Sequence, residues 1–560
     1  MKPIAMNREL NVMFNKLMLG CVAAISLPAI AQTNDFYGTL HPYASENIYF
    51  VITDRFVDGD KSNNFELDSG FNIPLEWPTG ETGNVGFLGG DFKGLLSQAD
   101  YIKNLGFTSV WTTPIFQNPS EAFSGGYEIK PTGFAMDRGK SGYHGYWGVN
   151  FYKLDKHLPS NGLDFQQLNQ KLADKGLKTV LDVVLNHGSP AYTMAKPQSQ
   201  FGKLFNKDGN LVADHMNLPP QALQLQTEPL HEFFYQQPDL AQLADINIEN
   251  PKAMDYFVDA YIQWLGQGAS ALRLDTVKHI PAHVWGEFSQ RIRKYYPDLF
   301  MFGEVYSYNA EEIAKYTYPK YGAMSVLDFP LKQAMDEVFA QGKGFERLVS
   351  ALYLENGPYA NPYELTTFYD NHDMPRINAT DNGFIDAHNW LFTARGIPVV
   401  YYGSEIGFNR GKPEHFGNRN YFGAENVQVA KGHVIAKNLA VIAKVRLNNI
   451  ALQRGIQIPI EMQDDTAAFY RVYQHDGVNQ TALVLLNKSD KSVSFTLPSD
   501  IQNGKWIDVI GKNNLQLISG QKIQIKAHGV KVFTFDTELT SEALLRKLAH
   551  SMTHRLGLEK

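Results

Sequence analysis

The sequence has almost no cysteine and no cluster of basic residues, and each absence excludes a class of protein. Its one cysteine is Cys21, so no disulfide bond can form within the chain. The net charge is -7 for 560 residues, with no basic block, so nucleic acid and anionic membranes are not expected partners. With 44% hydrophobic and 19% charged residues, the chain is predicted to be globular, with one large domain and at least one smaller one.

The N-terminal segment has the pattern of an export signal. Lys16 precedes a small and apolar run, 17–30, and Ala29 and Ala31 form a small-x-small cleavage site. The run is short and contains Pro28, which favours cleavage over a membrane anchor. We therefore expect residues 1–31 to be removed from a secreted or periplasmic protein, which then makes no membrane contact and contains no cysteine.

Strand and helix patterns alternate from residue 47 to about 405, which predicts an α/β fold. Eight strands separated by helices are typical of a (β/α)8 TIM barrel, whose chemistry lies at the C-terminal ends of the strands. The candidate strands are 48–53, 109–113, 179–184, 271–275, 300–305, 325–328, 365–369 and 398–402.

Four of these apolar segments end in ionisable or amide side chains. Arg273 and Asp275 are two residues apart, so on a strand they share a face and the guanidinium can hold the carboxylate ionised. Glu304 ends the next strand, and two carboxyls on neighbouring strand ends are the minimum apparatus for cleaving a glycosidic bond. One such pair is usually a structural ion pair, but four polar strand ends are hard to explain by packing.

The four segments, in this order, resemble the sequence signatures of glycoside hydrolase family 13, the α-amylase family. A fifth family motif is recognisable at 243–247, and the resemblance covers roughly 46–450. The matching positions are Asp182, Asn186, His187, Arg273, Asp275, Lys278, His279, Glu304, His372 and Asp373.

The resemblance implies a retaining mechanism. Asp275 would be the nucleophile, Glu304 the general acid and base, at roughly 5 to 5.5 Å from it, and Asp373 a third carboxylate that binds ring hydroxyls. The residues implied to contact substrate are Tyr146, Trp147, His187, Arg273, Lys278, His279 and His372. Tyr146 and Trp147 also fit a hydrophobic core, and that alternative stays open.

The resemblance implies calcium at two places. The first site would use Asn186, Asp245 and the main-chain carbonyl of His279, an all-oxygen set that a hard cation prefers. The second, as in cyclodextrin glucanotransferases, would use a larger set: side-chain oxygens of Asp58, Asp60, Asn63, Asn64 and Asp91 and the carbonyl of Gly89. Asp-Gly and Asn-Asn sequences also form turns without metal, so the second site has a competing interpretation.

The family's domain organisation can be placed on this chain. A Gln-, Pro- and Asn-rich stretch resembles the small domain inserted after the third strand, and alternating strands at 466–473, 481–486, 492–497 and 530–535 predict a C-terminal antiparallel β-sandwich. The expected limits are 1–31 for the signal, 32–187 and 247–450 for the barrel, 188–246 for the insert, 451–536 for the β domain and 537–560 for a tail helix.

The motifs favour an α-glucan, as polysaccharide or oligosaccharide, as the partner, and the protein is expected to be a monomer. Lys278 and His279 after the nucleophile resemble enzymes that act on α-1,4 links. Ala241 stands where cyclising enzymes carry a large aromatic, and the chain ends before their two extra domains, so hydrolysis is expected over cyclisation. A cyclodextrin or pullulan hydrolase, a glucanotransferase and a non-catalytic starch-binding protein are the alternatives.

Overall fold

The computed structural model describes residues 35–78, 80, 82–130 and 136–557, which belong to one unit, 35–560. The expected signal segment, 1–31, lies outside the described residues. In the part of the chain that is described, no helix is both long and apolar enough to cross a membrane.

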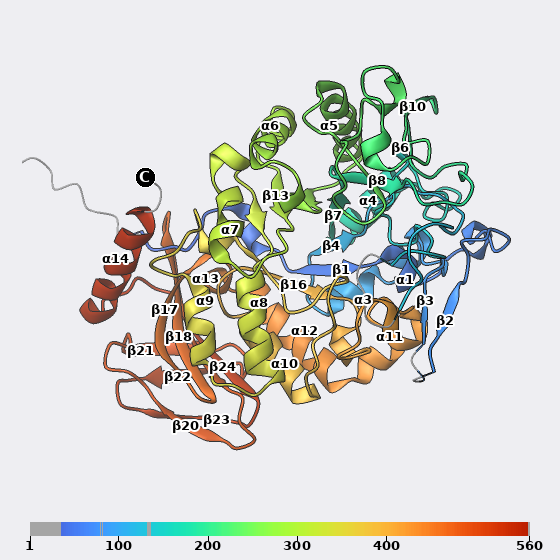
Figure 1. The fold of residues 1–560 in the computed structure, drawn as a ribbon. Helices are drawn as coiled ribbons and strands as arrows, with labels where there is room; N and C mark the ends of the chain where they lie inside the picture. The colour runs from blue at the N-terminus through green and yellow to red at the C-terminus, as the bar shows by residue number, and fades with distance from the viewer. Residues whose placement is uncertain (1–34, 79, 81, 131–135, 558–560) are drawn as a thin grey trace, which may run out of the picture. The chain divides into compact units, whose positions relative to one another are not determined.

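Eight parallel strands form a barrel, and all eight coincide with the strands expected from the sequence (Figure 1). The strands are β1 (Ile48–Val51), β4 (Ser109–Thr112), β7 (Lys178–Val183), β12 (Ala271–Leu274), β13 (Phe300–Gly303), β14 (Ser325–Val326), β15 (Thr366–Thr367) and β16 (Ile397–Tyr401). Their spatial order is β14-β13-β12-β7-β4-β1-β16-β15, so neighbours in sequence are neighbours in space.

The barrel closes between its two shortest strands, β14 and β15. One parallel bridge, Leu327 to Thr366, joins them. The Asp328 amide donates to the Thr366 carbonyl at 3.0 Å in this backbone bridge, and the hydroxyls of Ser325 and Thr366, 2.8 Å apart, add a side-chain contact. The seam therefore combines little backbone pairing with one side-chain hydrogen bond.

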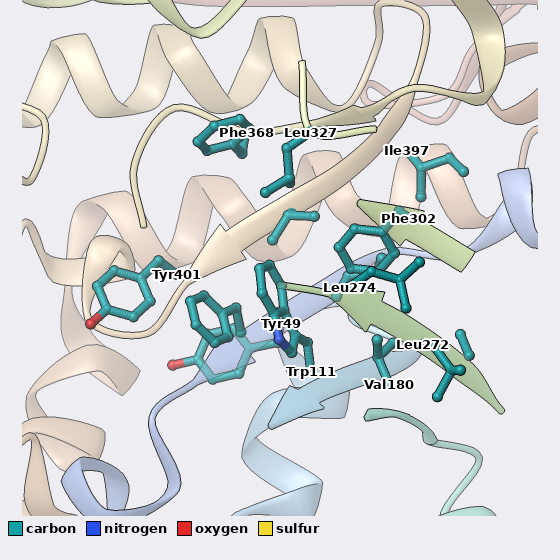
Figure 2. Close-up of a cluster of buried hydrophobic side chains, with 14 of the residues drawn as sticks. Tyr49, Trp111, Val180, Leu272, Leu274, Phe302, Leu327, Phe368, Ile397 and Tyr401 are labelled. Atoms are coloured by element: carbon teal, nitrogen blue, oxygen red, sulfur yellow. The ribbon is translucent and has the colours of Figure 1, made fainter. Parts of the chain in front are cut away.

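Large apolar side chains fill the space around the barrel strands (Figure 2). The labelled residues include Trp111, Leu272 and Phe302, and each is almost fully buried. Strands buried on both faces read as continuous apolar runs, which is why their positions were visible in the sequence.

Helices follow the strands in the order expected for this fold (Figure 1). The helices of the barrel are α1 (Thr53–Phe56), α2 (Phe92–Ser97), α3 (Ala99–Asn104), α4 (Phe165–Asp174), α5 (Pro251–Gly266), α6 (Ala282–Arg293), α7 (Ala310–Ala314), α8 (Phe329–Met335), α9 (Glu346–Leu352), α10 (Asp381–Leu391), α11 (Gly423–Gly432) and α12 (Val434–Leu447). Local sequence fixes several of their starts: Asp164 and Gln167 form a capping box at α4, and Asn250 caps α5 ahead of Pro251.

Short antiparallel pairs occupy the long connections beside the barrel. They are β2 (Pro74–Glu76) with β3 (Thr82–Asn84), β5 (Phe116–Gln117) with β6 (Asn150–Leu154), β8 (His187–Pro190) with β11 (Leu243–Asp245), and β9 (Lys203–Phe205) with β10 (Leu211–Asp214). The pairing of β8 with β11 places Asp245 opposite His187, so the two ends of the predicted insert meet at the barrel.

The C-terminal part is antiparallel β, as expected. A six-stranded sheet has the order β17-β18-β19-β24-β21-β22, and β20 pairs with β23. The strands are β17 (Ile456–Gln463), β18 (Thr466–His475), β19 (Val478–Asn487), β20 (Val493–Thr496), β21 (Gly504–Asp508), β22 (Asn513–Leu517), β23 (Lys522–Ile525) and β24 (Gly529–Phe535). A short helix, α13 (Ile450–Arg454), connects the barrel to this domain.

The tail forms the expected helix, α14 (Glu542–Gly557), drawn in dark red in Figure 1. Its apolar stripe of Leu544, Leu548 and Met552 is buried in the core of the β domain. The helix contacts β17, the edge strand of the sheet, and the Ser551 hydroxyl donates to Glu355 at 2.9 Å. The helix therefore covers a sheet edge that is otherwise free to pair with another chain.

Candidate active site

A cavity of about 470 Å³ lies where the barrel strands end. It brings together the predicted catalytic residues and all of the predicted substrate-contacting residues except Arg273. Asp275 directly follows β12 and Glu304 directly follows β13. The predicted residues that line the cavity are Tyr146, Trp147, His187, Asp275, Lys278, His279, Glu304, His372 and Asp373. The three predicted catalytic carboxylates therefore face one space.

Arg273 is placed differently from the expectation that it contacts substrate. It is 0% exposed and lies behind the carboxylates instead of in the cavity wall. Its guanidinium donates to Asp182 at 2.9 Å, to Asp275 at 2.7 Å and to Glu304 at 2.6 Å. Because the guanidinium is fully buried behind the carboxylates, it acts as the shared cation of three carboxyl groups, and it holds Asp275 as the spacing of the two residues in the sequence predicts.

Three carboxyl groups of this centre have raised pKa values, those of Glu304, Asp373 and Asp182. Burial raises the pKa of Glu304 to about 8, and Asp373 and Asp275 add to the rise while Arg273 opposes it. Burial likewise raises the pKa of Asp373 to about 6 and that of Asp182 to about 7. Near neutral pH, Glu304 therefore carries a proton that it can donate, as a general acid requires.

The backbone after Asp275 is strained. Thr276 has φ of 49°, a left-handed conformation that a β-branched residue rarely adopts. The turn is held because the Val277 amide donates to the Glu304 carbonyl at 2.9 Å and the Glu304 amide donates to the Leu274 carbonyl at 2.8 Å. These two bonds fix the ends of β12 and β13, and with them Asp275 and Glu304, relative to each other.

Two aromatic residues of the wall have different surroundings. The Tyr146 hydroxyl donates to Asp182 at 2.8 Å, and its ring stacks on His372 with centroids 5.2 Å apart. Trp147 packs into a small apolar cluster with Phe123 and Phe201, so it serves the core as well as the wall. Both residues therefore belong to an apolar cluster and also line the cavity, and Tyr146 is in addition hydrogen-bonded to the polar centre.

The histidines are buried and uncharged. Burial lowers the pKa of His187 and lowers that of His372 well below its usual value. His372 Nε2 lies 3.1 Å from Asp373. A neutral imidazole at these positions can donate a hydrogen bond without adding positive charge to the site.

A second set of charged residues lines the cavity, and the sequence interpretation missed it. Arg419 uses three nitrogens: it donates to the His372 carbonyl at 2.9 Å and to Asp373 at 2.7 Å, and it pairs with Glu414 at 2.9 Å. Glu414 also accepts from Lys140 at 3.1 Å, and Lys140 pairs with Asp137 at 3.4 Å. Asp137 and Lys140 lie in the loop between β5 and β6, and Glu414 and Arg419 lie in the loop after β16. In the sequence, the only sign of a functional role is that these loops follow barrel strands.

Small apolar residues form another part of the wall. Leu240, Ala241 and Leu243 line the cavity, and Ala241 has φ of 49°. Its carbonyl accepts from the Tyr192 hydroxyl at 2.7 Å. The position where cyclising relatives are expected to carry an aromatic side chain therefore faces the cavity here with a methyl group.

The first predicted calcium site brings its side chains near a further acid, Asp239. The Asn186 amide donates to Asp239 at 3.0 Å, and the His279 ring lies 2.9 Å from the other Asp239 oxygen. Burial raises the pKa of Asp245 to about 7 and Asp239 adds to this rise, while no hydrogen bond among the described residues reaches the Asp245 carboxylate. Asp239 is thus already hydrogen-bonded, whereas the Asp245 carboxylate is not, and Asp245 together with the Asn186 amide oxygen fits the oxygen ligands of a divalent cation.

The second predicted site combines both interpretations offered by the sequence. Asp60 accepts from Ser62 and Asp91 accepts from the Gly94 amide at the start of α2, as in metal-free turns. The three remaining predicted side chains each keep a buried oxygen without a hydrogen-bond partner among the described residues. These atoms are Oδ1 of Asp58, Oδ1 of Asn63 and Oδ1 of Asn64.

Other contacts draw the second cluster together. Asn64 donates to Asp58 at 3.1 Å and Asn63 donates to Asp91 at 3.1 Å. Gly89 packs so closely that a Cβ there would lie 2.5 Å from Asn64 Oδ1. Within the described residues, no three His, Cys, Asp or Glu side chains form a metal group, so both sites depend on amide and carbonyl oxygens.

Comparisons with known proteins cover most of the chain. Residues 50–437 match the family described as alpha amylase, catalytic domain, and 458–532 match the maltogenic amylase C-terminal domain. A β/α-amylase of Paenibacillus polymyxa is 28% identical over 88% of this chain, which spans 38% of that protein's length. An α-amylase of Niallia circulans is 28% identical over 97% of this chain and 99% of its own.

A solved structure gives a further comparison. It is a cyclomaltodextrin glucanotransferase with a three-domain ABC distribution, with a TM-score of 0.73 and 27% identity, covering 88% of this chain and 99% of its own. Chains related to this one thus include both hydrolases and transferases.

Proposed function

The chain belongs to the α-amylase family, as a glycoside hydrolase or transferase, and from that premise we propose that it hydrolyses α-1,4-glucosidic bonds of starch, glycogen and related malto-oligosaccharides. One observation carries the proposal. Asp275, Glu304 and Asp373 line a single cavity, and Arg273 bonds to the first two from behind. The proposed gap of roughly 5 to 5.5 Å between Asp275 and Glu304 is the one a retaining mechanism needs.

The proposed reaction has two displacements. Glu304 donates its proton to the leaving glycosidic oxygen while the Asp275 carboxylate attacks the anomeric carbon, so the glycosidic bond breaks and an ester bond to Asp275 forms. Ionised Glu304 then removes a proton from water, and the water oxygen displaces Asp275. Two inversions leave the configuration at the anomeric carbon retained.

The surrounding residues are proposed to bind the sugar at the cleavage point. Asp373 accepts hydrogen bonds from ring hydroxyls, and its negative charge helps keep Glu304 protonated. The neutral histidines His187 and His372 donate to hydroxyls, and the Tyr146 ring offers an apolar face for stacking. Lys278 also lines the cavity, and its ammonium donates to the Tyr306 carbonyl at 2.8 Å.

The experiment compares wild type with Glu304→Gln on soluble starch. Wild type is expected to release reducing ends with retained configuration, followed by NMR of the first product, and the variant to lose at least about 10³-fold in kcat because the acid is absent. Glu337→Gln, on the exterior near α9, is a matched control with unchanged activity. Equal activity of Glu304→Gln and wild type contradicts the assignment of the acid.

Transglycosylation is the second candidate. One of the similar structures is a glucanotransferase with only three domains, so the absence of two further domains does not argue against this activity. The wall at Ala241 favours hydrolysis, because a methyl group gives a glucan chain no aromatic surface on which to curl back. Product analysis on amylose, pullulan and cyclodextrin separates the alternatives. Cyclic products as the main outcome would overturn the hydrolase proposal, and a starch-binding protein without catalysis would give no products at all.

We also propose calcium as the resident cation. At the first site Asn186, Asp245 and the His279 carbonyl would hold it, and at the second Asp58, Asn63, Asn64 and Gly89 would, beside Asp91. When bound, the ion would neutralise buried carboxylates and tie loops together. Asp60, whose Oδ1 is already taken by Ser62, is left out of the proposed set.

Export remains a proposal that the sequence of residues 1–31 supports. Mass spectrometry of protein recovered outside the cytoplasm would show a chain that begins near Gln32. A full-length chain starting at Met1, Met6 or Met13 would contradict cleavage.

A further inference from the structure

A row of alternating charges runs along one wall of the cavity and ends at Asp373. Its members are Asp137, Lys140, Glu414, Arg419 and Asp373, joined by contacts of 3.4, 3.1, 2.9 and 2.7 Å. All five line the cavity. Every member except the two ends lies between two partners of opposite charge.

The two cations are buried and Glu414 and Asp373 are partly buried, so these charges act on each other with reduced screening. Lys140 and Arg419 are each 6% exposed. Lys140 and Arg419 meet at the same oxygen of Glu414, Oε1. The two cations therefore share one carboxylate oxygen, so a stronger interaction of Glu414 with Lys140 weakens its interaction with Arg419.

The loop that carries Arg419 is fixed to the segment that carries Asp373. The Asn418 amide donates to the Asn371 carbonyl at 2.8 Å, and Arg419 itself donates to the His372 carbonyl at 2.9 Å. Arg419 cannot move away when its partners change. A change of charge at Glu414 or Lys140 therefore changes the electrostatic interaction between Arg419 and Asp373.

We propose that Glu414 and Lys140 are positioning residues that act through Arg419 and set the charge that Asp373 presents to the sugar. The proposal rests on the proposed function, in which Asp373 binds ring hydroxyls. Glu414 weakens the hold of Arg419 on Asp373, which leaves the Asp373 carboxylate freer to accept hydrogen bonds from the sugar but raises its pKa. Lys140 limits how far Glu414 does so.

Charges on several elements face this wall and must be included in any pH profile. They are Arg419 and Glu414 after β16, Arg273 and Asp275 of the β12 segment, Glu304 after β13, and Lys140 and Asp137 after β4. His144, His372 and His415 are also there, and burial lowers their pKa values, that of His415 to about 4, so they are uncharged near neutral pH.

Substitutions at Glu414 and Lys140 are expected to shift the acid limb of the pH profile in opposite directions. In Glu414→Gln, Arg419 keeps its full charge for Asp373, so the pKa of Asp373 falls and the acid limb of kcat against pH moves down by roughly 0.5 to 1 unit. In Lys140→Met, the negative charge of Glu414 is no longer offset by Lys140 and offsets more of the Arg419 charge, so the acid limb moves up by a smaller amount, about 0.3 to 0.5 unit. Glu414→Gln should also lose about tenfold in kcat with KM changed less than about threefold, and Glu414→Asp should restore most of it.

The experiment measures kcat and KM from pH 4 to 9 for wild type, Glu414→Gln, Glu414→Asp, Lys140→Met and the double variant. Glu425→Gln, on the exposed face of α11, removes one surface carboxylate and is the matched control. Opposed shifts with cancellation in the double variant support the proposal. Shifts of the same sign, or a raised KM with an unchanged profile, overturn it and make these residues direct sugar contacts.

A measurement without turnover separates this proposal from the proposed function. Infrared titration of each variant, minus the same variant carrying Asp373→Asn, isolates the Asp373 carboxylate. Opposed shifts of its pKa uphold the row of charges even if no α-glucan is cleaved. An unchanged Asp373 pKa in folded Glu414→Gln overturns it even if wild type is an active amylase.

Discussion

Replacing Arg273 by methionine tests whether one guanidinium holds the catalytic centre together. The side chain is 0% exposed and bonds to three carboxyl groups, Asp182, Asp275 and Glu304. Removing one partner of a buried ionic network typically lowers the free energy of unfolding by about 3 to 5 kcal/mol. At about 2.1 cal/mol/K per residue, the unfolding entropy of this chain is about 1.1 kcal/mol/K, so Tm should fall by about 3 to 5 °C.

The decrease in Tm caused by Arg273→Met should depend on pH, because the carboxyl groups that Arg273 contacts titrate. Burial raises the pKa of Asp182 to about 7 and that of Glu304 to about 8, and Arg273 opposes both rises, so both values increase further without it. A carboxyl whose pKa is higher in the folded state contributes stability while protonated, and loses it as pH rises through the folded value. The difference in Tm between variant and wild type should therefore be smallest near pH 5 and largest near pH 8.

Calorimetry at pH 5, 6, 7 and 8 measures this difference. Arg291→Met is the control, because Arg291 pairs with Asp255 at the surface and should change Tm by less than about 1 °C at any pH. A drop in Tm that is the same at pH 5 and pH 8, or no drop at all, would refute the view that Arg273 acts as the shared cation.

Three further predictions concern other parts of the molecule. Asp373→Asn removes a charge that raises the pKa of Glu304, so the alkaline limb of kcat/KM, expected near pH 8, should move down by roughly 0.5 to 1 unit; an unmoved limb contradicts the coupling. Asp58→Ala should weaken calcium stabilisation, seen as a smaller difference in Tm between calcium and chelator than in wild type, and an equal difference argues against the second site. Ending the chain at Thr540 uncovers the apolar surface under α14, so Tm should fall and binding of a hydrophobic dye should rise, and unchanged values of both would show that the helix contributes nothing.

The barrel was predictable because its strands are continuous apolar runs and the residues at their ends are polar. Asp275 and Glu304 could be found in this way, since each follows its strand at once. In the β domain, by contrast, β17 and β21 to β23 were missed; β21 to β23 have only four or five residues, whereas β17 has eight with alternating apolar side chains and contains a proline, which argues against a strand.

What the sequence could not supply was which distant residues meet. Glu414 and Arg419 reach the cavity from a long loop, and Lys140 from another, so no strand pattern marks them. Asp239 lies beside Asn186 and His279 for the same reason. Arg273 was recognised, but whether it faces the sugar or the carboxylates depends on depth, and depth is a property of the folded barrel alone.

The barrel is expected to open first at the junction of β14 with β15. Strand pairs elsewhere exchange several backbone bonds, whereas this one has a single bridge and the hydroxyl contact of Ser325 with Thr366. Amide protons at this junction should exchange with solvent sooner than those of β12. On heating, the wall would part between β14 and β15, and the pairing of β12 with β13, which fixes Asp275 and Glu304 relative to each other, would persist longer.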